Sequence, residues 1–151
     1  MKMKKIASFT VNHDTLTEGI YVSRIDGDVT TYDLRTRVPN GDDFMDNLTM
    51  HSVEHMLATL LRNGKIADKI IYFGPMGCQT GFYLLVRDAE NEEVLAELIS
   101  ALRGVISAEE MFGAKREECG NYKNLSLEAA KRECERYLAI LQNKDNDFKY
   151  R

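Results

Sequence analysis

Two of the three histidines in the chain lie four residues apart, in the pentapeptide H-S-V-E-H at positions 51–55. Four residues are slightly more than one helical turn, so on a helix both imidazoles reach the same side. Glu54 lies three residues after His51 and shares that side. Two imidazoles suit a zinc or ferrous ion, and a neighbouring carboxylate suits proton transfer. The pattern therefore predicts a metal site, against the simpler alternative of solvated helix histidines.

A catalytic metal site commonly has three protein ligands and an open position. Cys119 is the better candidate for the third ligand, because it lies beside Gly120 in a polar segment where core packing explains a cysteine poorly. A plain loop thiol is the alternative. Cys134 falls on the apolar stripe of an expected helix and is predicted to pack in the core.

Cys78 lies in a glycine-flanked bend between two expected strands. Near a cationic metal its thiol could have a lowered pKa and act as an acid or base, but taken alone it is better explained as a small buried cysteine at a strand end. Taken alone, His13 and Arg35 are surface or structural residues, and Arg35 fits an exposed strand position.

The bulk composition narrows the class of protein. A chain of 151 residues predicts one domain, residues 1–151, and its 44% hydrophobic and 29% charged residues argue against disorder. The net charge of −4 attracts neither nucleic acid nor an anionic membrane, and no stretch approaches the roughly 18 apolar residues of a membrane span. The basic start lacks the apolar run of a signal peptide, and three cysteines do not suggest a disulfide framework. A cytoplasmic location is the expectation.

The segments around these residues predict an α+β fold of two layers, with an antiparallel sheet of about four strands against three or so helices. A hairpin is expected around the turn at 26–28, and Asn47 is a plausible N-cap for the histidine helix. The expected strands cover 20–25, 29–35, 70–73 and 81–86, and the expected helices cover 48–62, 92–103 and 126–141. The polar tail, 142–151, gives little reason to pack.

Five motifs in this order resemble those of the S-ribosylhomocysteine lyase (LuxS) family. They are Ser8-Phe9 with His13, Y-D-L-R at 32–35 with Pro39-Asn40, H-S-V-E-H at 51–55, P-M-G-C-Q-T-G-F-Y at 75–83, and C-G at 119–120. Together they are far more specific than any one of them, and they are spread over most of the chain.

The resemblance implies a metal-dependent carbon–sulfur lyase. Such an enzyme cleaves S-ribosylhomocysteine to homocysteine and 4,5-dihydroxy-2,3-pentanedione, the autoinducer-2 precursor, by enolisation, carbonyl migration and β-elimination. It serves quorum sensing and the activated methyl cycle. The family implies a homodimer with its sites at the interface and one divalent metal per subunit, Fe(II) expected and Zn(II) or Co(II) able to replace it. Carried over by motif, the metal ligands are His51, His55 and Cys119, the acid/base pair is Cys78 and Glu54, and the substrate-binding residues are Ser8, His13 and Arg35.

Two other functions fit part of the pattern. A small zinc hydrolase also uses H-x-x-E-H, but it would leave the segments around Cys119 and Cys78 unexplained. A non-enzymatic metal-binding module would need no acid or base, so Glu54→Gln should then leave every property intact.

Overall fold

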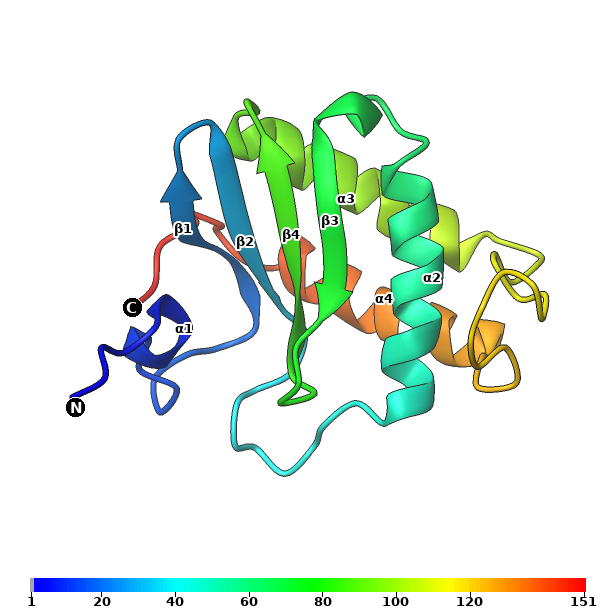
Figure 1. Ribbon diagram of the computed structural model, residues 1–151, viewed down its shortest axis with the longest axis horizontal. Helices are drawn as coiled ribbons and strands as arrows, with labels where there is room; N and C mark the ends of the chain where they lie inside the picture. The colour runs from blue at the N-terminus through cyan, green and yellow to red at the C-terminus, as the bar shows by residue number, and fades with distance from the viewer. Residues whose placement is uncertain (1) are drawn as a thin grey trace.

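Four extended segments of the chain pair into one sheet, and its apolar side chains contribute to the core. The computed structural model describes residues 2–151 and has an open four-stranded sheet in the order β1-β2-β4-β3, with all neighbours antiparallel (Figure 1). Side chains such as Ile20, Leu34 and Leu84 point into the core, in keeping with the period of two along a strand. The strands are β1 (Gly19–Asp26), β2 (Val29–Arg35), β3 (Ile70–Pro75) and β4 (Gly81–Arg87).

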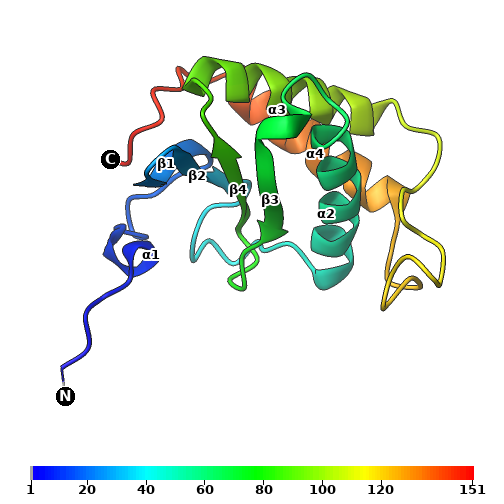
Figure 2. The same ribbon diagram turned by 45° about the horizontal axis from the view of Figure 1, so that its top comes forward.

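Three amphipathic helices bury their apolar stripes against one face of this sheet (Figure 2). Cys134 is buried as predicted, and burial raises the pKa of its thiol. The three helices are α2 (Asn47–Leu61), α3 (Asn91–Ile106) and α4 (Leu127–Gln142). The α+β prediction is confirmed for the sheet and these helices. Among residues 2–151, no helix combines the length and apolar character that crossing a bilayer requires.

Two short helices have too few turns to give a periodic signal, and they were not predicted. One, Ala67–Lys69, precedes β3. The other, α1 (Ala7–Thr10), lies on the side of the sheet away from α3 and α4 (Figure 2). Because α1 is short, that side of the sheet is largely uncovered by other elements of residues 2–151.

The N-cap of α2 is Asp46, so the prediction of Asn47 was wrong by one residue. The Asp46 carboxylate accepts a hydrogen bond from the backbone N–H of Thr49 at 2.8 Å. Hydrogen bonding by Thr49 holds the pKa of Asp46 below its usual value. The Asn47 side chain instead accepts a hydrogen bond from Asn124, in the loop before α4.

The end of the chain packs, and the prediction that 142–151 has little reason to do so was wrong. The backbone N–H of Val22 donates to the carbonyl of Phe148 at 2.8 Å, so the tail adds to the edge at β1. Phe148 is 6% exposed and meets the ring of Tyr32 edge to face, with 6.3 Å between ring centroids. Two aromatic side chains two residues apart give this polar segment apolar surface to bury.

Candidate metal centre and thiol loop

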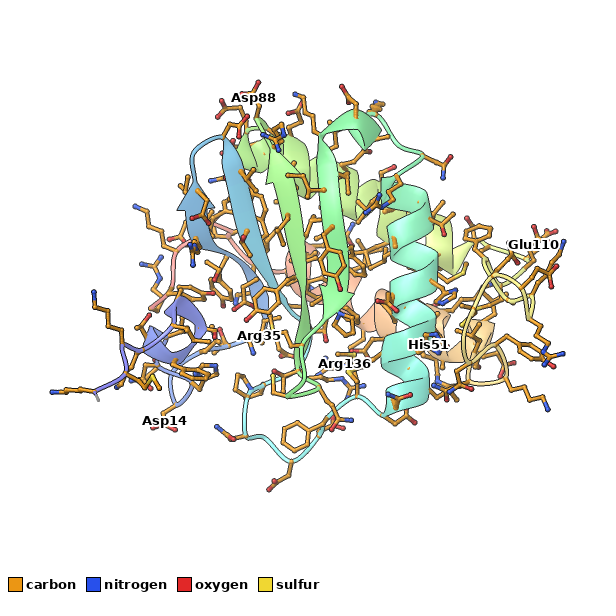
Figure 3. All side chains as sticks on the ribbon, in the orientation of Figure 1. Asp14, Arg35, His51, Asp88, Glu110 and Arg136 are labelled. Atoms are coloured by element: carbon orange, nitrogen blue, oxygen red, sulfur yellow. The ribbon has the colours of Figure 1, made fainter. Side chains whose placement is uncertain are left out.

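The helix α2 presents His51 and His55 on one side and its core residues on another. Val53, Met56 and Leu57 are almost fully buried, and this fixes the rotation of the helix. The two imidazoles are half-buried and meet edge to face, with 4.7 Å between ring centroids and 84° between their planes. His51 therefore points away from the sheet, toward the long loop before α4 (Figure 3).

That loop, 107–126, joins α3 to α4 and runs back beside α2 (Figure 1). It carries Cys119, whose Sγ lies 3.4 Å from Nε2 of His51. The ligand atoms of His51, His55 and Cys119 all lie within 4.8 Å of one another. The fold thus brings the three predicted ligands together from two distant parts of the sequence.

Main-chain carbonyls in the loop fix which nitrogen of each histidine faces the cluster. Nδ1 of His51 lies 2.9 Å from the carbonyl oxygen of Asn124, and Nδ1 of His55 lies 3.0 Å from that of Phe112. A carbonyl oxygen can only accept, so each Nδ1–H donates there and Nε2 is the ring nitrogen that faces the cluster. Two such imidazoles and a thiolate form a donor set that fits zinc, ferrous iron or cobalt.

Gly113 lets the loop approach His55 closely. Its φ of +67° is in the left-handed region, and a Cβ at this position would lie 2.7 Å from Nδ1 of His55. Phe112, Gly113 and Asn124 were not predicted as parts of the site. Carbonyl groups occur at every residue, so only the glycine in a polar loop could have drawn attention to this segment.

Glu54 lies on α2 between the two histidines and is half-buried. Among the described residues 2–151, no group donates a hydrogen bond to its carboxylate. The side chain can therefore take up or release a proton without breaking an existing contact.

Cys78 lies in the turn 76–80 between β3 and β4, and its thiol is exposed. The interpretation of a small buried cysteine is therefore wrong, because the turn projects beyond the sheet. Sγ lies 3.0 Å from Oγ1 of Thr80 and 3.9 Å from Nη1 of Arg35. The Arg35 guanidinium therefore places a positive charge beside this thiol.

Arg35 is 3% exposed, so the expectation that it could occupy an exposed strand position is wrong. Its guanidinium donates to both oxygens of Asp33, from Nε at 3.0 Å and from Nη2 at 2.6 Å, and from Nη1 to Thr80 at 2.8 Å. Burial acts to lower the pKa of Arg35, but the hydrogen bond and charge of Asp33 outweigh it and raise that pKa. The guanidinium thus stays charged while buried.

Strand register brings Arg35 to the thiol turn. Arg35 is paired with Gly81, the first residue of β4, so the turn residues 78–80 that precede Gly81 lie beside it. A Cβ at Gly81 would lie 2.5 Å from the carbonyl oxygen of Leu34, so only glycine permits this close pairing.

Ser8 and His13 lie near the N-terminus, on the α1 side of the sheet. Ser8 lines a groove of about 280 Å³ with Tyr72 and Tyr83. His13 is half-buried, and its Nδ1 lies 2.9 Å from the carbonyl oxygen of Val11.

Among the predicted site residues, the metal ligands form one group, and Arg35 with Cys78 forms another. Arg35 and His51 lie apart, on β2 and α2, with β4 and β3 between these elements (Figure 3). Within residues 2–151, no hydrogen bond or ion pair connects the metal ligands with the Arg35–Cys78 group. Within the described residues, the metal ligands and the Arg35–Cys78 group are thus separate.

A sequence model of the family described as S-Ribosylhomocysteinase (LuxS) matches residues 6–148. A protein of Borreliella afzelii named S-ribosylhomocysteine lyase is 47% identical over 98% of this chain and 99% of its own. Proteins with the same name from Clostridium acetobutylicum and Desulfotalea psychrophila are 43% and 42% identical, and cover 96% and 93% of this chain. These matches extend over 96% and 94% of the two relatives.

Proposed function

The chain belongs to the S-ribosylhomocysteinase (LuxS) family, and we propose that His51, His55 and Cys119 hold the metal of its active site. Its reaction is that of a carbon–sulfur lyase: it cleaves S-ribosylhomocysteine to homocysteine and 4,5-dihydroxy-2,3-pentanedione, the autoinducer-2 precursor. The observation that supports the metal site most is the convergence of three ligand atoms within 4.8 Å.

The proposed metal is one divalent ion per subunit, with Fe(II) expected and Zn(II) or Co(II) able to replace it. When bound, such an ion supplies Lewis-acid stabilisation of the negative charge that develops on substrate oxygens during enolisation. The chain contributes a donor set already oriented for this purpose, because carbonyls bind both Nδ1–H groups and the backbone N–H of Asn121 donates to Sγ of Cys119 at 3.4 Å.

Glu54 and Cys78 are proposed as the acid/base pair. Moving a carbonyl along the sugar requires removing a proton from one carbon and delivering one to its neighbour, and the final β-elimination removes another. Two groups that approach the substrate from different sides can do this. Glu54 has a carboxylate with no hydrogen-bond donor among residues 2–151, and Cys78 has a thiol beside the positively charged Arg35.

Ser8, His13 and Arg35 are proposed to hold the substrate. The buried, charged Arg35 can bind polar oxygens of the substrate with little loss of side-chain entropy, because Asp33 already fixes its plane. Ser8 offers a hydroxyl in the groove on the same side of the sheet.

We further propose a homodimer whose sites lie at the interface. The separation of the two residue groups supports this, because a second copy can bring one group to the other. Apolar side chains on the uncovered side of the sheet support it too, with Phe9 68%, Ile6 58% and Tyr72 51% exposed.

We also propose a single domain over residues 1–151, which one continuous core supports. A cytoplasmic location is proposed as well, because three unpaired cysteines are compatible with a reducing compartment.

The direct test is thiol release from S-ribosylhomocysteine, followed with a thiol-reactive dye. We expect release by the Fe(II)-loaded protein and none after chelation. Glu54→Gln and Cys78→Ala should keep the metal and lose turnover. Normal turnover in either variant would remove that residue from the mechanism.

The metal site has its own readout in the Co(II)-loaded protein, whose thiolate ligand gives a charge-transfer absorption. Cys119→Ala should remove this band, and Cys134→Ala, the matched change at a buried thiol, should keep it. A band that survives Cys119→Ala would exclude Cys119 as a ligand. Peptide cleavage without thiol release would instead indicate a zinc hydrolase.

A further inference from the structure

The last residues of the chain contact the Arg35–Cys78 group. The hydroxyl of Tyr150 donates to Oδ2 of Asp33 at 2.7 Å, across 117 positions of sequence. The same oxygen accepts from Nη2 of Arg35 at 2.6 Å. A continuous set of hydrogen bonds therefore runs from the C-terminal tail, through a buried ion pair, to the thiol of Cys78.

Several contacts hold the Tyr150 ring in this place. It stacks on Tyr21 of β1, with 5.1 Å between ring centroids and 21° between planes. Two residues earlier, Phe148 is buried in the core and its carbonyl accepts from the N–H of Val22. The tail thus has Phe148 as an anchor in the core and Tyr150 beside the ion pair.

We infer that Tyr150 and Asp33 are positioning residues that aim the Arg35 guanidinium at Cys78 and so favour its thiolate. The catalytic role of Cys78 in this inference rests on the proposed function, whereas the geometry that links Tyr150 to Cys78 does not. Asp33 occupies the Nε–Nη2 edge of the guanidinium, which leaves Nη1 directed at Thr80 and Cys78. Tyr150 in turn supplies the donor that completes the hydrogen bonding of Asp33.

The tyrosine is suited to act as a donor. Burial, followed by the charge of Asp33, raises the pKa of Tyr150, so the hydroxyl stays protonated at neutral pH. The tail also touches the segment that carries His13, because Oγ1 of Thr15 donates to the carbonyl of Arg151 at 3.0 Å. The last residues therefore contact two of the segments proposed to hold the substrate.

Removing the hydroxyl has two effects, and both disfavour the thiolate of Cys78. Asp33 loses a donor that disperses its negative charge, and a more negative neighbour raises a thiol pKa. Asp33 also becomes freer to turn, which loosens the guanidinium it holds. Both effects act in the same direction, so the inference predicts the sign of the change in thiolate formation at Cys78.

The test compares Tyr150→Phe with the parent as metal-loaded, full-length protein. The rate of iodoacetamide alkylation at Cys78 is measured against pH, with the modified peptide identified by mass spectrometry. We expect the midpoint of this profile to rise by about one pH unit, and the acid limb of kcat to move the same way. The value of kcat/KM should fall about tenfold at neutral pH.

Tyr21→Phe is the matched control. It removes a hydroxyl from the other ring of the stacked pair, but that hydroxyl donates to the carbonyl of Thr17 and does not touch Asp33. The midpoint for Cys78 should stay at the parent value. Thermal unfolding of both variants shows whether either change acts only by loosening the tail.

An unchanged Cys78 midpoint in folded Tyr150→Phe would overturn the inference, even with normal lyase activity in the parent. A midpoint that moves equally in both variants would also overturn it, because loss of tail packing would then be the cause. A midpoint that moves only in Tyr150→Phe supports it, even from a parent that releases no homocysteine. In that case the proposed catalytic roles would fail and the positioning would stand.

Discussion

At the scale of single residues, the sequence gives the type of each proposed metal ligand, whereas the folded backbone gives its orientation. His51, His55 and Cys119 are identified by type, whereas the nitrogen that each histidine offers is decided by the carbonyls of Asn124 and Phe112. Those carbonyls are aimed by the backbone path of the loop. A change in that path should therefore alter metal binding without altering any ligand.

Gly113→Ala tests this dependence. Alanine is strained at a φ of +67°, at a cost of roughly 1–2 kcal/mol, and its Cβ would lie 2.7 Å from Nδ1 of His55. We expect the loop to move and the affinity for Co(II) to fall about tenfold or more, as for other losses of outer hydrogen bonds. Titration of the charge-transfer band measures it.

Gly120→Ala is the control for this change. It lies next to Cys119, and a Cβ there meets nothing within 4 Å. Its Co(II) affinity should match that of the parent. Parent-like affinity in Gly113→Ala would show that the approach of the loop to His55 does not matter.

At the scale of elements, the tail acts as an addition to the edge of the sheet at β1. Phe148 fills space beside Tyr32 and is 6% exposed. Phe148→Ala should lower the free energy of unfolding by about 3 kcal/mol, the low end for a buried phenylalanine. Urea unfolding measures this, and Phe44→Ala, at a residue 42% exposed, should cost far less. Equal losses would mean that the tail does not pack.

Burial of Tyr32, a residue of β2, predicts that the stability of the fold changes with pH in the alkaline range. Tyr32 donates to Oδ1 of Asn91 at 2.6 Å, and burial, followed by the charges of Glu90 and Glu92, raises its pKa from 10.0 to about 12. Between these values the unfolded chain loses this proton and the folded chain keeps it. The contribution is thus fully present below pH 10 and is lost as the pH rises toward 12.

The corresponding prediction is that the free energy of unfolding falls between pH 10 and about 12, and that Tyr32→Phe makes this fall less steep. Urea unfolding at a series of pH values measures the slope. Tyr72→Phe, at an exposed position, is the control. A slope in Tyr32→Phe as steep as in the parent would exclude Tyr32 as a source of the dependence.

At the scale of the whole molecule, the two residue groups need to meet before the proposed chemistry can occur. Arg35 and Cys78 belong to the sheet and its β3–β4 turn, while the metal ligands belong to α2 and the loop 107–126. The homodimer proposed above, with each site shared between two copies, would explain both this separation and the uncovered side of the sheet.

Mixing two inactive variants tests the shared site. If Glu54 and Cys78 of one site come from different subunits, dimers of Glu54→Gln with Cys78→Ala contain one site with both changes and one with neither. After random exchange, about a quarter of the parent activity should return. The measurement is homocysteine release after mixing under conditions that allow subunit exchange. No recovery with proven exchange would place both residues in the same subunit.

The core elements could be predicted because each contains a strong local pattern. The hairpin has β-branched residues around Gly27, and α2, α3 and α4 have apolar residues at helical spacing. The packing of the tail could not be predicted, because Phe148 and Tyr150 are two isolated aromatic residues in a polar segment. These two residues pack against the edge of β1, which is distant from them in sequence.

The sequence by itself determined the kinds of residue available for chemistry: two histidines with a glutamate at helical spacing, and cysteines in a polar loop and in a glycine-flanked turn. It determined the family through five ordered motifs. Only the tertiary structure decided that Arg35 is buried and paired with Asp33, that carbonyls orient both histidines, and that Tyr150 reaches the same ion pair. The physical reason is that side-chain type and local periodicity are encoded along the chain, whereas burial, hydrogen-bond partners and backbone approach depend on segments that meet only in the folded protein.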